Sequence, residues 1–221
     1  MSIYEPYMAR IRSGGTTPKE SNDMLSEIRQ VDLILTSVDR SDVKLNKEKE
    51  LYPSIVSNVD KFGKRRFIFL PHTDVETGYY IEYQNYTYLA TDKNNDPIYP
   101  ELFAEVCNAE FPVLIKQMKY QTGTSDMGSP IWGYKDEIEM IPCVMTNQIY
   151  SALSNQPIPL PTGAMIMKIP YNPEHVIHIN YAIKIRNSEY KTIDVAYQHV
   201  INEKGYVEVH LQREVDKKSE R

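Results

Sequence analysis

The chain is short of cysteine, of long apolar runs and of targeting signals. Cys107 and Cys143 are the only cysteines among its 221 residues. Two cysteines are too few for a disulfide scaffold, so we expect buried free thiols. No apolar run approaches the ~20 residues of a membrane-spanning helix, and the first residues lack the apolar core of a signal peptide. These features predict synthesis in the cytosol and no membrane partner.

The chain also lacks an excess of positive charge, because 25 Lys and Arg are outnumbered by 30 Asp and Glu and the formal net charge is −5. A dedicated nucleic-acid binder usually presents a basic face to phosphates, so the composition does not favour that class. The basic cluster from Lys64 to Arg66 precedes the apolar run from Phe67 to Leu70. Consecutive cations of this kind are expected at a solvated strand edge, where they discourage edge pairing.

Recognisable catalytic and metal-binding motifs are missing as well. The sequence has no glycine-rich phosphate loop, no nucleophile elbow and no His-Glu-x-x-His helix. His175 and His178 are three residues apart, which in a strand places them on opposite faces and disfavours a shared metal. Cys107, in the pattern AEVCN, is typical of a core residue. We therefore expect no enzyme, no catalytic residue, no metal and no cofactor.

Tyrosine, by contrast, is abundant, with 17 Tyr against 5 Phe and 1 Trp. Tyrosine favours strands, and it also suits interfaces where the ring is buried and the hydroxyl stays hydrated; both explanations remain open. From Arg66 onward, apolar and polar residues alternate with the period of a strand. The sequence predicts a mainly β fold, a barrel or sandwich built from antiparallel hairpins, with one N-terminal α-helix and long loops.

The N-terminal helix is expected to begin at a capping box. Thr17 and Glu20 have the spacing for reciprocal hydrogen bonds, and Pro18 presets the first helical φ. The helix should end near Ser37 or Asp39. One narrow apolar stripe follows helical spacing, and its residues are Met24, Leu25, Ile28, Val31 and Leu35. Such a stripe packs on a sheet or on a neighbouring subunit, and we favour the sheet.

One strand pair recurs along the chain. The segment GYYIEYQNYTYLATD, residues 78–92, is echoed by NYAIKIRNSEYKTID, residues 180–194, at an offset of 183 − 81 = 102. Asn85 and Asn187 fall where each chain would reverse, so both segments are predicted to be β-hairpins. Duplication of one unit and convergence on a common hairpin pattern both explain the echo.

Two segments rich in glycine or proline are candidate interaction elements. Residues 120–134 carry the strongest loop signal, which suits either a binding loop or a hairpin tip packed on its own domain. The candidate lumen or interface residues of this loop are Met127, Ile131, Trp132 and Tyr134. Residues 154–162 hold three prolines and are predicted to be an extended crossover or arm. The candidate interface residues of this arm are Pro157, Ile158, Pro159, Leu160 and Pro161.

These features suggest a simple domain organisation. Residues 1–65 are expected to form a helical segment and an extended arm, and residues 66–215 a β-rich domain. Within that domain, residues 66–118 and 163–215 are candidate related hairpin units. Residues 216–221 form a charged tail that is expected to fray.

The order of several short segments resembles the head–tail connector and head-closure proteins of tailed bacteriophages of Gram-positive hosts. The similarity runs from Phe67 to Val215, about two thirds of the chain. The similarity is carried by the segments GYYIEYQNYTYLATD, AEVCN, IPCVMTNQIY, IKIRNSEYKTIDVAY and GYVEVHLQRE. The glycine-rich hairpin between AEVCN and IPCVMTNQIY also contributes.

The resemblance implies a structural virion protein assembled in the host cytoplasm. Such a protein is a stopper in the phage neck: a homo-oligomeric ring below the portal or adaptor protein that closes the DNA channel and joins the tail terminator or tail proteins. It would lie transiently close to packaged DNA, and an acidic subunit suits a channel wall that DNA must pass without binding. The alternatives are another ring, adaptor or tail terminator, and a carbohydrate-binding tail module suggested by the tyrosines.

Overall fold

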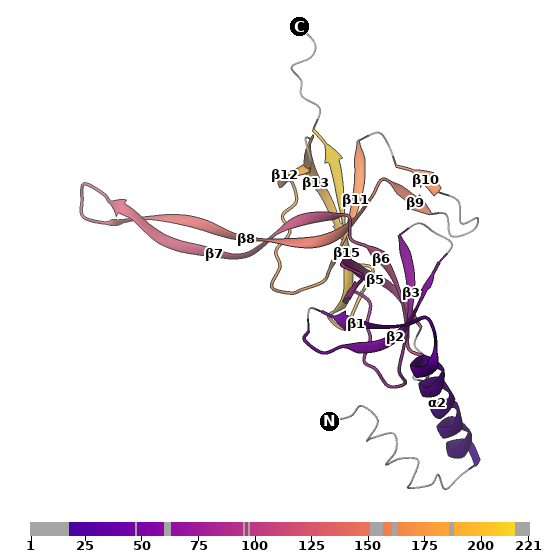
Figure 1. Cartoon of the computed structure of the whole chain (residues 1–221). Coiled ribbons are helices and arrows are strands. Elements are labelled where there is room, and N and C mark those ends of the chain that lie inside the picture. The colour runs from indigo at the N-terminus through magenta and orange to yellow at the C-terminus, as the bar shows by residue number, and fades with distance from the viewer. Residues whose placement is uncertain are drawn as a thin grey trace. The chain divides into compact units, whose positions relative to one another are not determined.

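The chain divides into two compact units between Glu105 and Val106. The structure is a computed structural model, and it describes residues 18–46, 48–59, 63–94, 96, 98–150, 157–160, 163–185 and 188–214 (Figure 1). The first unit is a closed six-stranded barrel and the second a nearly closed one. The predicted mainly β fold, built from antiparallel hairpins with an N-terminal helix, is confirmed.

The first unit is one helix and one closed barrel. Its elements are α2 (Pro18–Thr36), β1 (Arg40–Leu45), β2 (Tyr52–Asn58), β3 (Lys64–Phe69), β4 (Tyr80–Tyr83), β5 (Tyr86–Asn94) and β6 (Glu101–Val106). The strands follow the order β1-β2-β3-β6-β5-β4, and β4 pairs back to β1. Closure leaves the barrel without a free sheet edge.

Helix α2 packs on the barrel of its own unit, as its apolar stripe predicted. Val31 and Ile34 are buried against Leu70, with Ile55 of β2 and Ile68 of β3 beside them. The helix begins at Pro18 and ends at Thr36, close to the predicted bounds. Thr17, and therefore the predicted capping box, lies outside the described residues.

The buried face of α2 differs in part from the predicted stripe. Leu25 is 49% exposed, whereas Glu27 and Gln30 are buried. The Glu27 carboxylate lies 3.0 Å from Nε2 of His72, which gives the buried acid a partner. The apolar spacing of the helix could not predict this face, because it includes the buried polar residues Glu27 and Gln30, and the partner of Glu27 lies outside the helix.

The basic cluster does not form a sheet edge, so that prediction was wrong. β3 lies inside the barrel between β2 and β6. Lys64 Nζ lies 2.7 Å from Glu105, and Arg66 donates to both carboxylate oxygens of Glu101 at 2.6 and 2.8 Å. The cations are neutralised across the ladder by acids of β6, a partnership that single-strand patterns do not reveal.

The second unit has the six strands of one barrel, a short strand β14 and a separate ribbon of β9 and β10. Its elements are β7 (Ala109–Thr124), β8 (Pro130–Thr146), β9 (Gln148–Tyr150), β10 (Pro157–Pro159), β11 (Ala164–Pro170), β12 (Ala182–Ile185), β13 (Ser188–Ala196), β14 (Val200–Ile201) and β15 (Lys204–Arg213). The main sheet follows the order β12-β13-β15-β11-β8-β7, β14 pairs with β15, and β9 with β10 forms a separate ribbon.

The two units share one strand topology. If the six main strands of each unit are numbered along the chain, both follow the order 1-2-3-6-5-4. Aligning the ladders matches buried position with buried position: Val43 with Phe111, Leu45 with Val113, Ser54 with Cys143, Phe67 with Met167, Phe69 with Ile169, Leu102 with Val209, and Ala104 with Leu211. The second unit therefore repeats the fold and the core pattern of the first.

The echoed hairpins occupy matching places in the two barrels. Ile81 pairs with Tyr88 in β4–β5, and Ile183 pairs with Tyr190 in β12–β13. The backbone two residues before each hairpin also matches, since Gly78 precedes β4 with a φ of 85° and Asn180 precedes β12 with a φ of 68°. Both predicted hairpins are confirmed, although Asn187 lies outside the described residues. Shared register, topology and core favour duplication over convergence on a hairpin pattern.

The division into units differs from the expected boundary at residues 65 and 66. Residue 65 lies within β3, whose neighbours β2 and β6 complete the first barrel. A cut there would separate hydrogen-bonded strands of one barrel. The compact units instead comprise residues 1–105 and 106–221.

One difference between the barrels predicts a stability change. Thr192 is fully buried, and its hydroxyl has no hydrogen-bond partner among the described residues, whereas the matching residue of the first barrel is Ala90. Thr192→Val keeps the shape and removes the desolvated hydroxyl, so it should raise the free energy of unfolding by about 1 kcal/mol. Denaturant unfolding measures this change.

The control for this prediction is Thr192→Ser, which keeps the hydroxyl and removes the methyl group. It should lower the free energy of unfolding. A destabilising Thr192→Val would contradict the assignment and would mean that the hydroxyl is hydrogen-bonded, for example by a trapped water.

Candidate interaction surface

The most prominent surface feature of the second unit is the long ribbon formed by β7 and β8. The two strands pair continuously from Ala109 with Cys143 to Thr124 with Pro130, with two register shifts. Only the base belongs to the barrel core, where Phe111, Val113 and Ile141 are buried. The rest extends away from the sheet of its own unit (Figure 1).

The glycine-rich segment predicted as a loop is mostly strand. The turn is confined to residues 125–129, where the Gly128 N–H donates to Ser125 O at 2.8 Å and the Ser125 N–H donates to Ser129 O at 2.7 Å. Gly133 lies in a paired strand opposite Tyr120. A Cβ at this position would come within 2.6 Å of the Thr122 methyl group, which favours glycine. The glycine signal therefore marked close packing across the ribbon as well as the turn.

Large apolar side chains of the ribbon are exposed. Among the predicted candidates, Met127 is 95%, Ile131 50% and Trp132 48% exposed. Further exposed apolar residues of the ribbon, missed by sequence reasoning, are Tyr120, Ile138 and Met140. The side chain of Tyr134 lies outside the described residues. The structure thus brings three candidates to one end of the ribbon, and the tip does not pack on its own unit.

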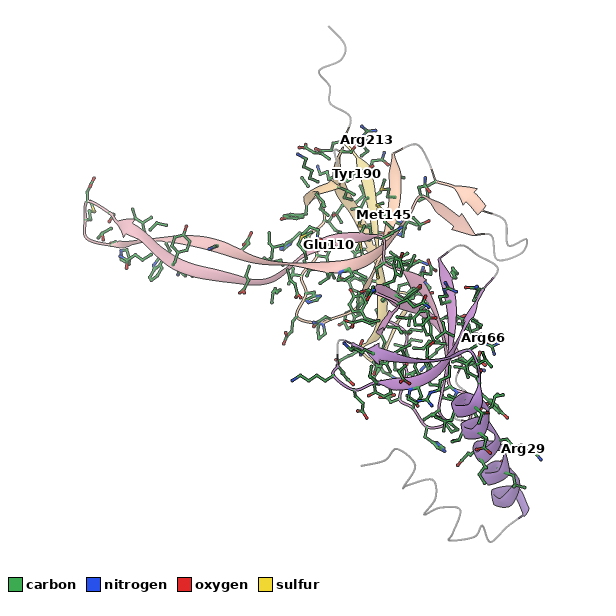
Figure 2. All side chains as sticks on the ribbon, viewed as in Figure 1. Arg29, Arg66, Glu110, Met145, Tyr190 and Arg213 are labelled. Atoms are coloured by element: carbon green, nitrogen blue, oxygen red, sulfur yellow. The ribbon has the colours of Figure 1, made fainter. Side chains whose placement is uncertain are left out.

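The ribbon carries charged side chains beside its exposed apolar ones. Lys119 Nζ lies 4.6 Å from the ring centroid of Trp132, within cation–π range. Figure 2 shows side chains projecting from both sides of the ribbon, beyond its base near Glu110 and Met145. An exposed two-stranded ribbon is at most marginally stable in water, so this element suits a surface that a partner covers.

The proline-rich arm is a second, shorter ribbon. β10 pairs with β9 through Pro157 with Tyr150 and Ile158 with Ile149, and the Leu160 N–H donates to Asn147 O at 2.9 Å. The prediction of an extended segment is confirmed, but the segment also joins a ladder. The side chains of Pro157, Ile158 and Pro159 and the whole of Pro161 lie outside the described residues.

A small pocket lies at the open seam of the second barrel, where β7 and β12 do not pair. It is lined by Pro112, Leu114, Ile138, Val176, Tyr181 and Thr192, among others. Leu114 is bridged to Val176 by two backbone hydrogen bonds of 3.3 and 2.8 Å. The pocket brings a buried hydroxyl and apolar walls together.

Titratable groups of the described residues form no cluster that could hold a metal ion. His175 and His178, weighed above as a pair, differ in exposure, since His178 is exposed and His175 only partly so. His175 Nε2 lies 3.9 Å from a Glu139 carboxylate oxygen. Nor does any described helix have the length and apolar character needed to cross a membrane.

Both cysteines are unpaired thiols, as predicted. Cys143 is fully buried, with Sγ 4.0 Å from the sulfur of Met167. Burial raises the pKa of Cys107 and of Cys143 to about 12. Both thiols therefore remain protonated and weakly nucleophilic at neutral pH.

Comparison with known proteins relates the second unit to a phage family. Fold and surface together describe a barrel domain that carries a long, exposed two-stranded ribbon. Residues 111–212 match the model of the YomX C-terminal domain, a phage-associated family. The match begins in β7 and ends in β15, so it spans the second barrel with its ribbons. A search of curated proteins finds no match to the chain.

The raised thiol pKa values predict slow alkylation of the native protein. At pH 8, iodoacetamide should label Cys107 and Cys143 about a thousandfold more slowly than an unperturbed thiol of pKa near 9. Mass spectrometry of timed samples measures the rates, and the protein in guanidinium chloride provides the rapidly labelled control. Fast native labelling of Cys107 would contradict the packed environment at the base of β7.

The single tryptophan predicts a fluorescence signature of a free ribbon. Trp132 is the only tryptophan in the chain and is half exposed. In dilute solution its emission should be strongly quenched by acrylamide. Protection of Trp132 from quenching at the lowest measurable protein concentration would contradict an exposed ribbon.

Proposed function

We propose that the protein is a structural component of the neck of a tailed phage. It forms a ring below the portal or adaptor protein, closes the DNA channel and joins the head to the tail. No catalytic step is part of this role. The phage-associated match of the second unit and the resemblance of the connector segments support this proposal.

The observation that carries the proposal is the exposed β7–β8 ribbon on the barrel core of the second unit. A ring subunit needs a rigid body and an element that becomes ordered against its neighbours. The barrels provide the body, with fully buried side chains such as Phe67 and Leu211. The ribbon provides the element, because Met127, Ile131 and Trp132 are exposed on it. Burial of such residues contributes most of the free energy of association.

The charge of the chain fits a channel that DNA passes. The net charge of −5 repels phosphates at long range, so DNA would slide past the wall instead of binding it. In the first barrel, Lys64 and Arg66 of β3 are paired with Glu105 and Glu101 of β6, which reduces their availability to phosphates.

A phage that lacks this gene tests the proposed role. Electron microscopy of the lysate, with DNA quantification, should show emptied heads beside normal free tails, because unclosed heads lose DNA. DNA-filled heads with overlong tails would place the protein at the tail terminator instead. Normal virions would contradict a structural role in the neck.

A deletion in the ribbon tests the interaction element. Removing residues 123–128 deletes the tip with Met127, and should abolish tail joining or DNA retention while the barrel folds normally. Circular dichroism checks the fold. The matched control is Ile201→Ser, which changes a residue of the same unit that is 73% exposed and lies off the ribbon. Normal virions assembled from the tip-deleted protein would contradict the proposed role of the ribbon.

A further inference from the structure

The duplicated barrels differ at one seam, and the closed copy shows how the open one could be completed. In the first barrel, β1 pairs with β4 through Lys44 with Glu82 and Leu45 with Ile81. The Asn46 N–H donates to Tyr80 O at 2.8 Å, and the side-chain oxygen of Asn46 accepts from the Tyr80 N–H at 2.9 Å. Lys44 Nζ also lies 3.7 Å from Glu82.

The second barrel lacks this pairing, and a proline stands at its seam. The ladder alignment places Pro112 at the position of Lys44, and proline has no N–H to donate to β12. The next seam residue, Leu114, bonds instead to Val176, in the connection before β12. β7 and β12 thus remain the two ends of the sheet.

Among the described residues, no strand pairs with the outer edge of β12. Ala182 and Lys184 hold the positions of Tyr80 and Glu82, and both are exposed. The Tyr181 carbonyl accepts from the Thr192 N–H at 3.1 Å. Since a trans peptide directs its C=O and N–H in opposite directions, the Ala182 N–H points away from β13. An unpaired edge of this kind is a template for strand addition.

The ribbon of the same chain offers a strand with a free edge. β8 pairs with β11 only through Val144 to Thr146, so no described strand lies beside its other edge from Ile131 to Met140. This stretch carries Asp136, Glu137 and Glu139, whereas β7 carries Lys116 and Lys119. The charge of Lys184, reversed relative to Glu82 in the closed seam, is complementary to β8.

We infer that the ribbon of one copy adds its β8 edge, Ile131 to Met140, to the free β12 edge of a second copy. The contact supplies backbone hydrogen bonds to Ala182 and Lys184 and covers exposed apolar side chains of the ribbon. It joins two different surfaces, so successive copies assemble head to tail, and such a chain of contacts closes into a ring or extends as a filament. Only closure into a ring rests on the proposed function.

Two variants of the full chain separate the two surfaces. Ala182→Pro removes the outward N–H of β12, at an exposed strand start where proline is tolerated. Replacing residues 117–136 with Asn-Gly shortens the ribbon and joins its strands by a tight turn. The matched control is Ala182→Ser, which keeps the N–H. Circular dichroism confirms that each variant folds.

Sedimentation velocity over a concentration series measures the result. The wild type and Ala182→Ser should associate with rising concentration, and each blocked variant alone should associate at least tenfold more weakly. An equimolar mixture of the two blocked variants should form a dimer, because one retains the ribbon and the other retains the edge. Added salt should weaken the association.

Three results would overturn the inference: a wild type that stays monomeric at millimolar concentration, an Ala182→Pro variant that associates like the wild type, or a mixture that forms no dimer. Failure of the proposed function looks different. A phage lacking the gene that still assembles normal virions would refute the neck role while leaving this contact intact.

Discussion

Satisfaction of backbone hydrogen bonds at sheet edges is the constraint on which this structure depends. In the first barrel, pairing of β1 with β4 removes both edges, so the unit has a closed sheet and its helix covers one side. In the second barrel the same seam is left open at Pro112, and the connection before β12 makes only one bridge across it. The two barrels thus share one strand order and differ in whether this seam is paired.

The two barrels have diverged mainly in their connections. Five residues join β2 to β3 in the first barrel, residues 59–63, whereas β9 and β10 lie in the corresponding connection of the second. The β1–β2 hairpin corresponds to the base of β7 and β8, which the second unit extends into the long ribbon. The buried positions meanwhile stay matched. Core packing tolerates little change in volume, whereas surface connections lengthen at small entropic cost, so the added ribbons lie in the connections.

Much of the fold follows from local patterns in the sequence. Alternation predicted the strands, Pro18 and the apolar spacing predicted α2, and the echo of residues 78–92 in residues 180–194 identified matching hairpins of the two barrels. The basic cluster was misassigned because Lys64 and Arg66 are paired by acids about 35 residues away or more, on β6. These ion pairs form because β3 and β6 are neighbouring strands of the barrel. The boundary between the units, near residue 105, follows from the same pairing of distant strands and is not visible in local patterns.

The candidate surface was predicted only in part. Composition located Met127, Ile131 and Trp132 on one element, but glycine and serine suggested a loop where the strands continue to Thr124 and resume at Pro130. The ribbon depends on hydrogen bonds between β7 and β8. The residue pattern of either strand alone does not reveal that these strands pair. Sequence patterns did not predict the open seam. Pro112 lacks the backbone N–H that its counterpart Lys44 has in the closed seam, and this difference is apparent only when the two barrels are aligned.

We propose that this chain is a neck subunit whose ribbon contacts its neighbours. Cryo-electron microscopy of virions that carry this gene, at a resolution that traces strands, tests this proposal. We expect a ring of this chain at the junction of head and tail, with the β7–β8 ribbon of each copy lying on an adjacent subunit. A position elsewhere in the virion, or a ring in which the ribbons extend into solvent without contacting a subunit, would contradict it.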